Sequence, residues 1–232
     1  MRNPTAAVVT AAVASTAVIS AAALSVVTAV HLAAQLTGAD GTANVTQWFL
    51  MPLLALTLWL AADGVRSARL VRLTLVALGF SWLGDTAPDV VGDDLGFVTM
   101  LGFFLLAHVA YLVAFWPLRR DGAVGRRPLL ALPYLAVLVA LLVACAPGTG
   151  ALLVPTIVYG VALTGVAVLA TFDPLAAVGG VLFLVSDSLI ALNAFVAGYA
   201  LPGHGFWVML TYVAAQALLA AGVLRTARRT RA

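Results

Sequence analysis

The sequence predicts an all-α membrane protein: a bundle of eight transmembrane helices forming a single integral domain over residues 1–232. Apolar residues make up 63% of the 232 residues, charged residues only 9%, and the mean hydropathy is +1.10. A soluble domain carries about 25% charged residues, so this chain cannot cover itself with a solvated surface. Its apolar runs are long enough to cross a bilayer, which admits only helices or closed barrels, and they lack the alternation typical of barrel strands.

A transmembrane helix needs about 20 mostly apolar residues, and turn-forming residues divide the chain into eight such runs. The first run is longer than the apolar core of a cleavable signal peptide, so it is interpreted as a retained helix. The second run is short. The predicted spans are Thr5–Ala34, Trp48–Ala62, Ala68–Thr86, Leu95–Trp116, Leu129–Ala146, Ala151–Ala170, Leu175–Ala197 and Phe206–Leu224.

The charge pattern supports the even number of spans. Every cation is an arginine and every anion an aspartate, and with eight spans all of the arginine clusters fall on one side. The positive-inside rule then places both termini in the cytoplasm, with the cell membrane as the expected location. Short arginine clusters between apolar runs indicate topology and give no sign of nucleic-acid binding. The clusters consist of Arg2, Arg66, Arg69, Arg72, Arg119, Arg120, Arg126, Arg127, Arg225, Arg228, Arg229 and Arg231.

Two aspartates fall inside predicted spans, where a carboxylate is costly. Asp85 lies in the segment FSWLGDTAPD and Asp187 in VLFLVSDSLIALNAF. An aspartate at a helix centre costs about 2.5–3.5 kcal/mol on insertion scales. Asp85 is near the outer end of its span and also fits a helix end at the membrane interface. Asp187 lies ~20 Å into its span at 1.5 Å per residue, which makes it the stronger functional candidate.

Other polar side chains in the spans predict a polar pocket inside the bundle. Singly, such groups often serve as hydrogen-bond partners between helices, but two carboxylates accompanied by a histidine, tyrosines and amides favour a functional pocket. The segments FSWLGD and FLVSD each place a serine shortly before the aspartate. This weak internal similarity favours two related four-helix halves with facing carboxylates. The accompanying candidates are Ser81, His108, Tyr111, Tyr159, Ser186, Asn193, Tyr212 and Gln216.

The same residues resemble the motifs of the YhhN-like lysoplasmalogenase family. The segment FSWLGDTAPDVVGDDLGFVTMLGFFLLAHVAYLVAF is similar to the family's Ser and Gly-Asp at a helix end, followed by Phe, Gly and F-x-x-x-H-x-x-Y. PTIVYG, GGVLFLVSDSLIALNAF and TYVAAQALLAAG resemble its later motifs, so the similarity runs from about Trp48 onward. The matching residues are Ser81, Gly84, Asp85, Phe97, Gly102, Phe104, His108, Tyr111, Phe115, Pro155, Tyr159, Gly180, Phe183, Ser186, Asp187, Tyr212 and Gln216.

The resemblance implies an ether hydrolase that cleaves the vinyl ether bond of lysoplasmalogens. The expected products are a fatty aldehyde and glycerophosphoethanolamine or glycerophosphocholine. The expected partners are a lysophospholipid, water and the bilayer, with no cofactor and no metal. Asp85 and Asp187 are the expected acid and base, unassigned because neighbouring carboxylates titrate together. His108 and Tyr111 are expected to orient water or the leaving oxygen, and the remaining candidates to support them.

One departure from the family pattern falls in the second span. The family usually carries Lys-Pro ahead of its Met-Pro, whereas QWFLMPLL keeps Met51-Pro52 but has Gln47 and Trp48 in those places. Gln47 therefore joins the supporting candidates. The chain lacks the positive charge that the lysine would bring to a phosphate or a carboxylate.

Two alternative functions also fit parts of the pattern. Buried carboxylates serve proton relays, so a small transporter or proton-coupled carrier is one alternative. A metal-dependent membrane lipid hydrolase is the other, although His31, His108 and His204 lie on separate spans or loops without the close spacing of zinc ligands. A closed, lipid-sized cavity favours a hydrolase, and a water path to both sides favours transport.

Overall fold

The computed structural model describes the backbone of residues 4–231 and the side chains of residues 15–92 and 95–231. Arg2 therefore lies outside the described residues, as do the side chains of Asp93 and Asp94. Within the described range the chain is helical and contains no strand. Its long helices are α1 (Pro4–Thr37), α2 (Asp40–Ala61), α3 (Arg69–Thr86), α5 (Asp93–Phe115), α7 (Leu132–Thr149), α8 (Leu153–Leu169), α9 (Pro174–Phe195) and α10 (His204–Arg229). Short helices α4 (Pro88–Val91) and α6 (Ala123–Arg126) lie in the connections.

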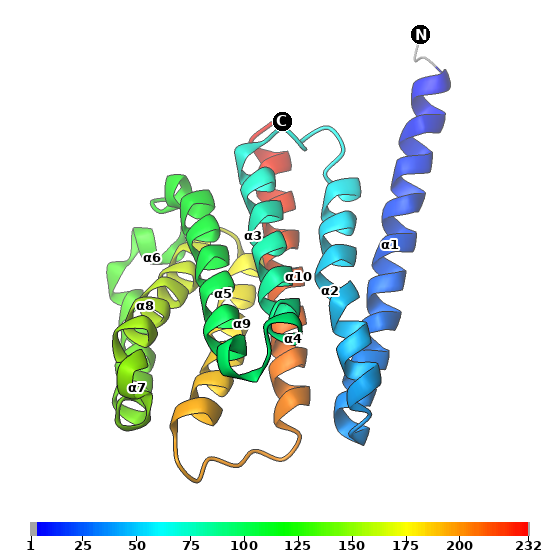
Figure 1. Ribbon diagram of the computed structural model, residues 1–232. Helices are drawn as coiled ribbons and strands as arrows, with labels where there is room; N and C mark the ends of the chain where they lie inside the picture. The colour runs from blue at the N-terminus through cyan, green and yellow to red at the C-terminus, as the bar shows by residue number, and fades with distance from the viewer. Residues whose placement is uncertain (1–3, 232) are drawn as a thin grey trace.

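The long helices confirm the predicted all-α membrane bundle. By length and composition, seven stretches are apolar enough to cross a membrane, and one of them, Pro128–Phe172, is 45 residues long. This stretch contains two helices, α7 and α8, separated by a turn at Gly150, whose φ is +50°. The described chain therefore holds eight long helices, and the start of α1 and the end of α10 lie at the same end of the bundle (Figure 1).

Helix α2 begins at Asp40, eight residues before the predicted start of the second span. The prediction started late because polar residues lower the hydropathy of this segment. The structure shows that such residues form hydrogen bonds within α2 and between α1 and α2. Thr46 donates to the carbonyl of Thr42 at 2.7 Å, and its hydroxyl lies 2.9 Å from Nδ1 of His31 on α1. His31 is fully buried, so it joins α1 to α2. Asp40 lies in the first turn, where a negative charge complements the helix dipole.

The C-terminal helix α10 is the centre of the bundle. It packs along α9 over most of its length and also contacts α1, α2 and α3, while α3 pairs with α5. The α9–α10 contact is close because glycine lies at the crossing: a Cβ on Gly179 would be 2.8 Å from the carbonyl oxygen of Ala215. This packing brings the polar faces of α3, α5, α9 and α10 together in the interior.

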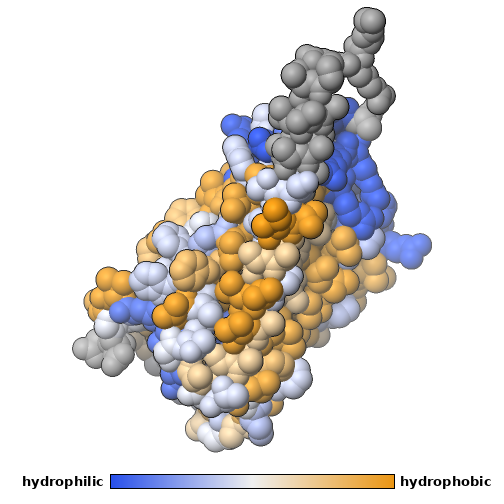
Figure 2. All heavy atoms as spheres, turned by 90° about the vertical axis from the view of Figure 1, so that its right-hand side faces the viewer, coloured by the Kyte–Doolittle hydropathy of each residue, from blue (hydrophilic) through white to orange (hydrophobic). Residues whose placement is uncertain are grey.

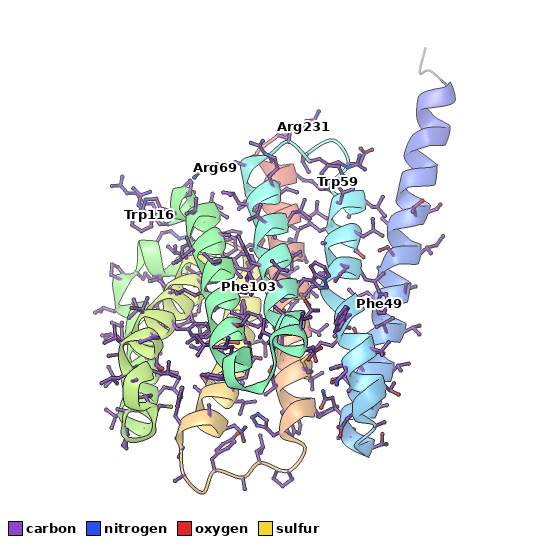
Figure 3. All side chains as sticks on the ribbon, in the orientation of Figure 1. Phe49, Trp59, Arg69, Phe103, Trp116 and Arg231 are labelled. Carbon is purple, nitrogen blue, oxygen red and sulfur yellow. The ribbon has the colours of Figure 1, made fainter. Side chains whose placement is uncertain are left out.

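The arginine clusters gather at one end of the bundle. Arg228 near the end of α10 donates to the carbonyl of Ala61 at the end of α2, at 2.6 Å. Arg69 at the start of α3 donates to the carbonyl of Val113 near the end of α5. Arg69 and Arg231 lie at this end in Figure 3. The links between helices at this end therefore carry the positive charge, as the predicted topology requires.

Tryptophans accompany these arginines. Arg66 lies over the ring of Trp59, 5.1 Å from its centroid, and Arg119 lies 4.8 Å from the centroid of Trp116. Both tryptophans lie toward the arginine end (Figure 3). Tryptophan is enriched where membrane meets water, so these pairs are typical of an interface.

The outer faces of the helices are apolar. Figure 2 shows the side of the molecule carrying α1, with apolar side chains across its middle and hydrophilic residues gathered toward the arginine end. Large exposed apolar side chains include Val143, Val154 and Leu129. Exposed apolar surface on this scale is unusual for a soluble monomer and fits contact with lipid. The chain is a multi-pass membrane protein.

Replacing Gly179 by alanine should lower the free energy of unfolding by about 1–3 kcal/mol, because the added methyl group forces α9 and α10 apart. Gly79→Ala on α3 is the matched control, since nothing lies within 4 Å of its added Cβ. There alanine should stabilise the helix by about 0.5–1 kcal/mol. Thermal unfolding of both variants in the same detergent measures the difference. Equal stability would contradict the close α9–α10 packing.

Candidate active site

Asp85 and Asp187 line the same cleft between α3, α5, α9 and α10. Their exposed fractions are only 8% and 6%, so each carboxylate is withdrawn from lipid and reaches free space at the cleft. The cleft encloses about 300 Å³. The lining of this polar cleft is Gln35, Gln47, Gly84, Asp85, Pro88, Asp89, Met100, Phe104, Ser186, Asp187, Ile190, His204, Gly205, Val208, Met209 and Tyr212.

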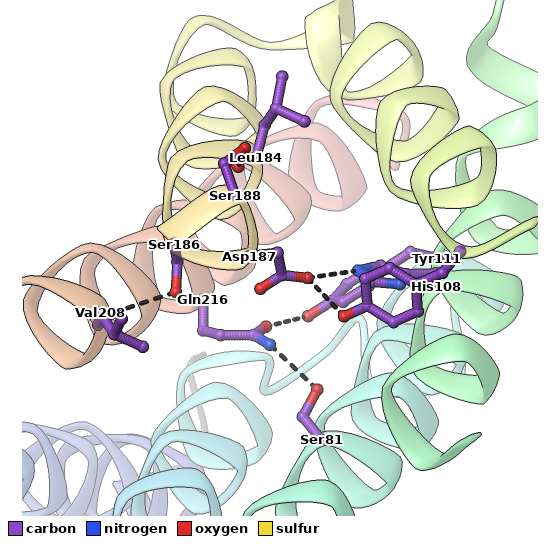
Figure 4. A network of polar contacts seen from close by, with 10 residues as sticks. Ser81, His108, Tyr111, Leu184, Ser186, Asp187, Ser188, Val208 and Gln216 are labelled. Carbon is purple, nitrogen blue, oxygen red and sulfur yellow. Dashed lines mark hydrogen bonds and ion pairs between the residues drawn. The ribbon is translucent and has the colours of Figure 1, made fainter. Parts of the chain in front are cut away.

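Each carboxylate accepts a hydrogen bond from a tyrosine hydroxyl. Tyr212 donates to Oδ2 of Asp85 at 2.9 Å, and Tyr159 donates to Oδ2 of Asp187 at 2.6 Å. Nε2 of His108 lies 3.6 Å from the same oxygen of Asp187. Figure 4 shows His108 and Asp187 facing each other. Each aspartate thus accepts a hydrogen bond from one tyrosine, and His108 lies beside Asp187 beyond hydrogen-bonding distance.

The contacts on the two aspartates follow one pattern. Asp85 on the third long helix is contacted by Tyr212 on the eighth, and Asp187 on the seventh is contacted by His108 on the fourth. If the chain is divided after its fourth long helix, each half places the last helix against the aspartate of the other half. The short stretches His108-Val109-Ala110 and Tyr212-Val213-Ala214 also match in two of three residues. Tyr159, which donates to Asp187, belongs to the same half as that aspartate, and the four-plus-four organisation stays a prediction.

The packing around Gly84 explains why a glycine precedes Asp85 at the end of α3. A Cβ at this position would lie 2.7 Å from the ring of Phe104, so only glycine leaves room for that ring. Phe104 in turn packs edge to face on Tyr212, with ring centroids 5.6 Å apart. The glycine therefore lets an aromatic wall form directly beside Asp85.

A second chain of hydrogen bonds joins α5, α10 and α3. The hydroxyl of Tyr111 donates to Oε1 of Gln216 at 2.5 Å, and Nε2 of Gln216 donates to Oγ of Ser81 at 3.0 Å. All three residues are fully buried, and Figure 4 shows them in line. Tyr111 was predicted to orient water or the leaving oxygen. Its hydroxyl points instead to Gln216, and Tyr111 is not among the residues that line the cleft. This geometry suits a positioning role.

Two further predicted residues hold the backbone around the aspartates. Ser186 donates to the carbonyl of Val208 at 3.1 Å and so joins α9 to α10. Gln47 on α2 donates through Nε2 to the main-chain carbonyl of Asp85 at 3.1 Å. Gln47 also lines the polar cleft, so the position that departs from the family pattern reaches the site.

Asn193 does not join the other candidates. Its side chain is exposed, in contrast to the buried Ser186. The spacing of seven residues correctly places both on one helical face, but two turns carry Asn193 about 10 Å farther along α9. The prediction that Asn193 supports the site is corrected accordingly.

Three residues at the mouth of the cleft were missed by the sequence analysis. Gln35 lies in the last turn of α1, Asp89 lies on α4 and His204 begins α10. Asp89 accepts a hydrogen bond from Nε1 of Trp48 at 2.9 Å. All three come from helix ends opposite the arginine end, so the cleft opens there. The only sequence signal was the Gly-His-Gly loop, because polar residues at helix ends are ordinary.

A second, narrower cavity adjoins the polar cleft. It encloses about 60 Å³ between α5, α7, α8 and α9, and Asp187 lines both spaces. Its lining is almost entirely apolar. This apolar slot is lined by Phe97, Met100, Leu101, Phe104, Leu138, Leu141, Leu142, Cys145, Thr156, Tyr159, Gly160, Leu163, Thr164, Leu184, Asp187, Ser188, Ile190, Ala191 and Phe195.

The cysteine and histidine residues show no grouping suited to a metal ion. Among the residues whose side chains the structure describes, no three of His, Cys, Asp and Glu gather in such an arrangement. His31 lies between α1 and α2, and Cys145 faces the apolar slot.

Fold and site together define a class of protein: a multi-pass helical membrane protein whose interior holds a cleft lined by two carboxylates. Residues 42–223 match the model of the YhhN family. This match covers well over half of the chain, which therefore belongs to the YhhN family, as its motifs indicated.

Two curated relatives carry the name Lysoplasmalogenase, one from Mycobacterium bovis (strain ATCC BAA-935 / AF2122/97) and one from Mycobacterium tuberculosis (strain CDC 1551 / Oshkosh). The chain is 36% identical to each over 158 residues. The matched part covers 65% of this chain and 60% of each relative, so the match spans about three fifths of their length. No solved structure matches the chain.

Proposed function

We propose that this protein is a lysoplasmalogenase-type hydrolase of the cell membrane, which cleaves the vinyl ether bond of lysoplasmalogens. The products would be a fatty aldehyde and a glycerophospho-ethanolamine or -choline. The observation that carries the proposal is the pair of carboxylates, Asp85 and Asp187, in one cleft of a YhhN-family bundle. The name of the two mycobacterial relatives supports the choice of substrate.

The chemistry of a vinyl ether suits a pair of carboxyl groups. A proton is first added to the outer carbon of the double bond, which leaves an oxocarbenium ion. Water then adds to the carbon that bears the oxygen, and the resulting hemiacetal collapses to aldehyde and alcohol. One water is consumed, and no redox change occurs. Proton donation by a positioned side chain typically contributes about 10²–10⁴-fold to such a step.

Two roles must therefore be filled. The first step needs a carboxyl group that carries a proton near neutral pH, a form favoured by burial among apolar groups. The second step needs a carboxylate that orients water and stabilises the cation, a division of labour analogous to that of glycosidases. We assign these roles to Asp85 and Asp187 jointly, with His108 and Tyr159 positioning Asp187 and Tyr212 positioning Asp85.

The proposed topology places the arginine end in the cytoplasm, following the positive-inside rule. The mouth of the polar cleft, at Gln35, Asp89 and His204, then opens on the opposite face of the membrane. Glycerophosphate headgroups lie in that interfacial zone. A lysophospholipid of the outer leaflet is therefore the substrate that reaches the carboxylates by the shortest route.

The shape of the cleft favours hydrolysis over transport. Its lining comes from helix ends on one side of the bundle and from the level of the aspartates. Below that level, the fully buried Tyr111, Gln216 and Ser81 close the interior with their hydrogen bonds. A carrier needs access from both faces, whereas a hydrolase needs only one.

Asp85→Asn and Asp187→Asn should each lower kcat for aldehyde release by about 10²–10⁴-fold with little change in KM, since each removes a proton-transfer group. Purified protein in detergent, assayed with a lysoplasmalogen, gives the measurement. Asp63→Asn is the matched control, because Asp63 is exposed at the arginine end and pairs only with Arg66 at 3.7 Å. Near-normal turnover in both variants would remove the carboxylate mechanism.

A further inference from the structure

The polar cleft and the apolar slot share one wall. Four residues line both spaces: Met100 and Phe104 of α5, and Asp187 and Ile190 of α9. The two cavities therefore adjoin each other at the boundary between α5 and α9. Among the shared residues Asp187 alone has an ionisable side chain.

Aromatic pairs limit the boundary at both ends. Toward the mouth of the cleft, Phe97 and Phe195 pack edge to face across α5 and α9, with ring centroids 5.6 Å apart. Deeper in the bundle, His108 and Phe183 pack with centroids 4.9 Å apart. Between them the boundary consists of half-buried Met100 and Ile190 beside Phe104 and Asp187. Methionine is unbranched and adapts its shape readily, so a hydrocarbon chain can pass between α5 and α9 at Met100.

We propose that the hydrocarbon chain of the substrate passes between α5 and α9 at Met100 and Ile190 and occupies the apolar slot, while its polar end stays in the cleft. The proposal rests on the proposed function and names the part of the protein that recognises the chain. The slot has almost no polar lining, which suits hydrocarbon, and its free volume of about 60 Å³ takes the first carbons of the chain beyond the vinyl ether. The cleft, at about 300 Å³, suits a glycerophosphate headgroup.

This placement separates the roles of the two aspartates. In the vinyl ether, the carbon that receives the proton lies on the chain side of the bond, and the carbon that receives water lies on the headgroup side. Asp187 lines both the slot and the cleft, whereas Asp85 lines the cleft alone. The geometry therefore makes Asp187 the donor to carbon and Asp85 the group that takes a proton from water.

The protons balance over one turnover. Asp187 gives its proton to the carbon, and Asp85 takes one from the attacking water as the hemiacetal forms. When the hemiacetal collapses, Asp85 passes its proton to the departing glycerol oxygen. The hemiacetal hydroxyl returns a proton to Asp187, and both carboxyl groups regain their starting states.

The first experiment compares two substitutions on α9. Ala191→Phe fills the slot, and Ala194→Phe makes the same change at an exposed position three residues on. Both are assayed for aldehyde release from vinyl ether lysolipids with a four-carbon or a sixteen-carbon alkenyl chain. Ala191→Phe should keep short-chain turnover and lose long-chain kcat/KM by at least about tenfold, the scale on which apolar pockets discriminate chain length. Ala194→Phe should match the wild type with both.

Thermal unfolding of the purified variant in the same detergent reports whether it folds, independently of its turnover. If Ala191→Phe does not fold, Cys145→Phe fills the slot from α7, where Cys145 is buried in the lining. An equal loss for both chain lengths in a folded variant, or no loss for either, overturns the passage into the slot. If the wild type releases aldehyde from neither substrate, it is the proposed function that fails.

The second experiment separates the aspartates by trapping the cation. In Asp85→Ala with added sodium azide, carbon protonation still occurs and azide takes the place of water, giving a product heavier than the substrate by one HN₃. In Asp187→Ala no cation forms, so no adduct should appear. Mass spectrometry of the lipid products gives the answer. An adduct in Asp187→Ala, or its absence from Asp85→Ala, would overturn the assignment.

Discussion

A carboxylate inside a membrane bundle persists only where other groups donate hydrogen bonds to it, because an unpaired charge in an apolar medium is costly. Here a tyrosine hydroxyl donates to each: Tyr212 to Asp85 and Tyr159 to Asp187. These bonds fix which helices surround the site, since α10 must reach α3 and α8 must reach α9. The bundle can therefore be understood as the packing that brings two donors to two carboxylates while leaving a cleft between them.

The crossed contacts explain why α10 is central. It carries Tyr212 to Asp85 and Gln216 to Tyr111 and Ser81, and it approaches α9 closely at Gly179. Satisfied polar networks of this kind rigidify a core, because each member would be unpaired in any other packing. The same rigidity benefits the proposed chemistry, which requires that two carboxyl groups keep fixed positions on either side of a small reacting bond.

The fold and the centre of the site could be predicted from the sequence. The fold follows from long apolar runs, and the site follows from the few polar residues that interrupt them. Runs of apolar residues give the helices, and Asp85, Asp187 and His108 are conspicuous within them. Two features could not be found this way. The residues at the mouth of the cleft, such as His204, lie at helix ends, where polar residues are common. The apolar slot is lined by residues whose sequence pattern is the same as that of core residues or lipid-facing residues. Asn193 shows the remaining difficulty. Helical spacing predicts the face of the helix on which a residue lies, but it does not predict whether another helix packs on that face at that position along the helix.

The central claim is that the protein hydrolyses its substrate by adding a proton to a carbon of the vinyl ether. Hydrolysis in heavy water tests it most directly, because the proton added to carbon then comes from exchangeable deuterium. The account predicts an aldehyde with one deuterium on the carbon next to the carbonyl group, measured by mass spectrometry after rapid reduction to the alcohol, together with the released glycerophospho-base. An aldehyde without deuterium at that carbon, produced at the normal rate, would contradict it.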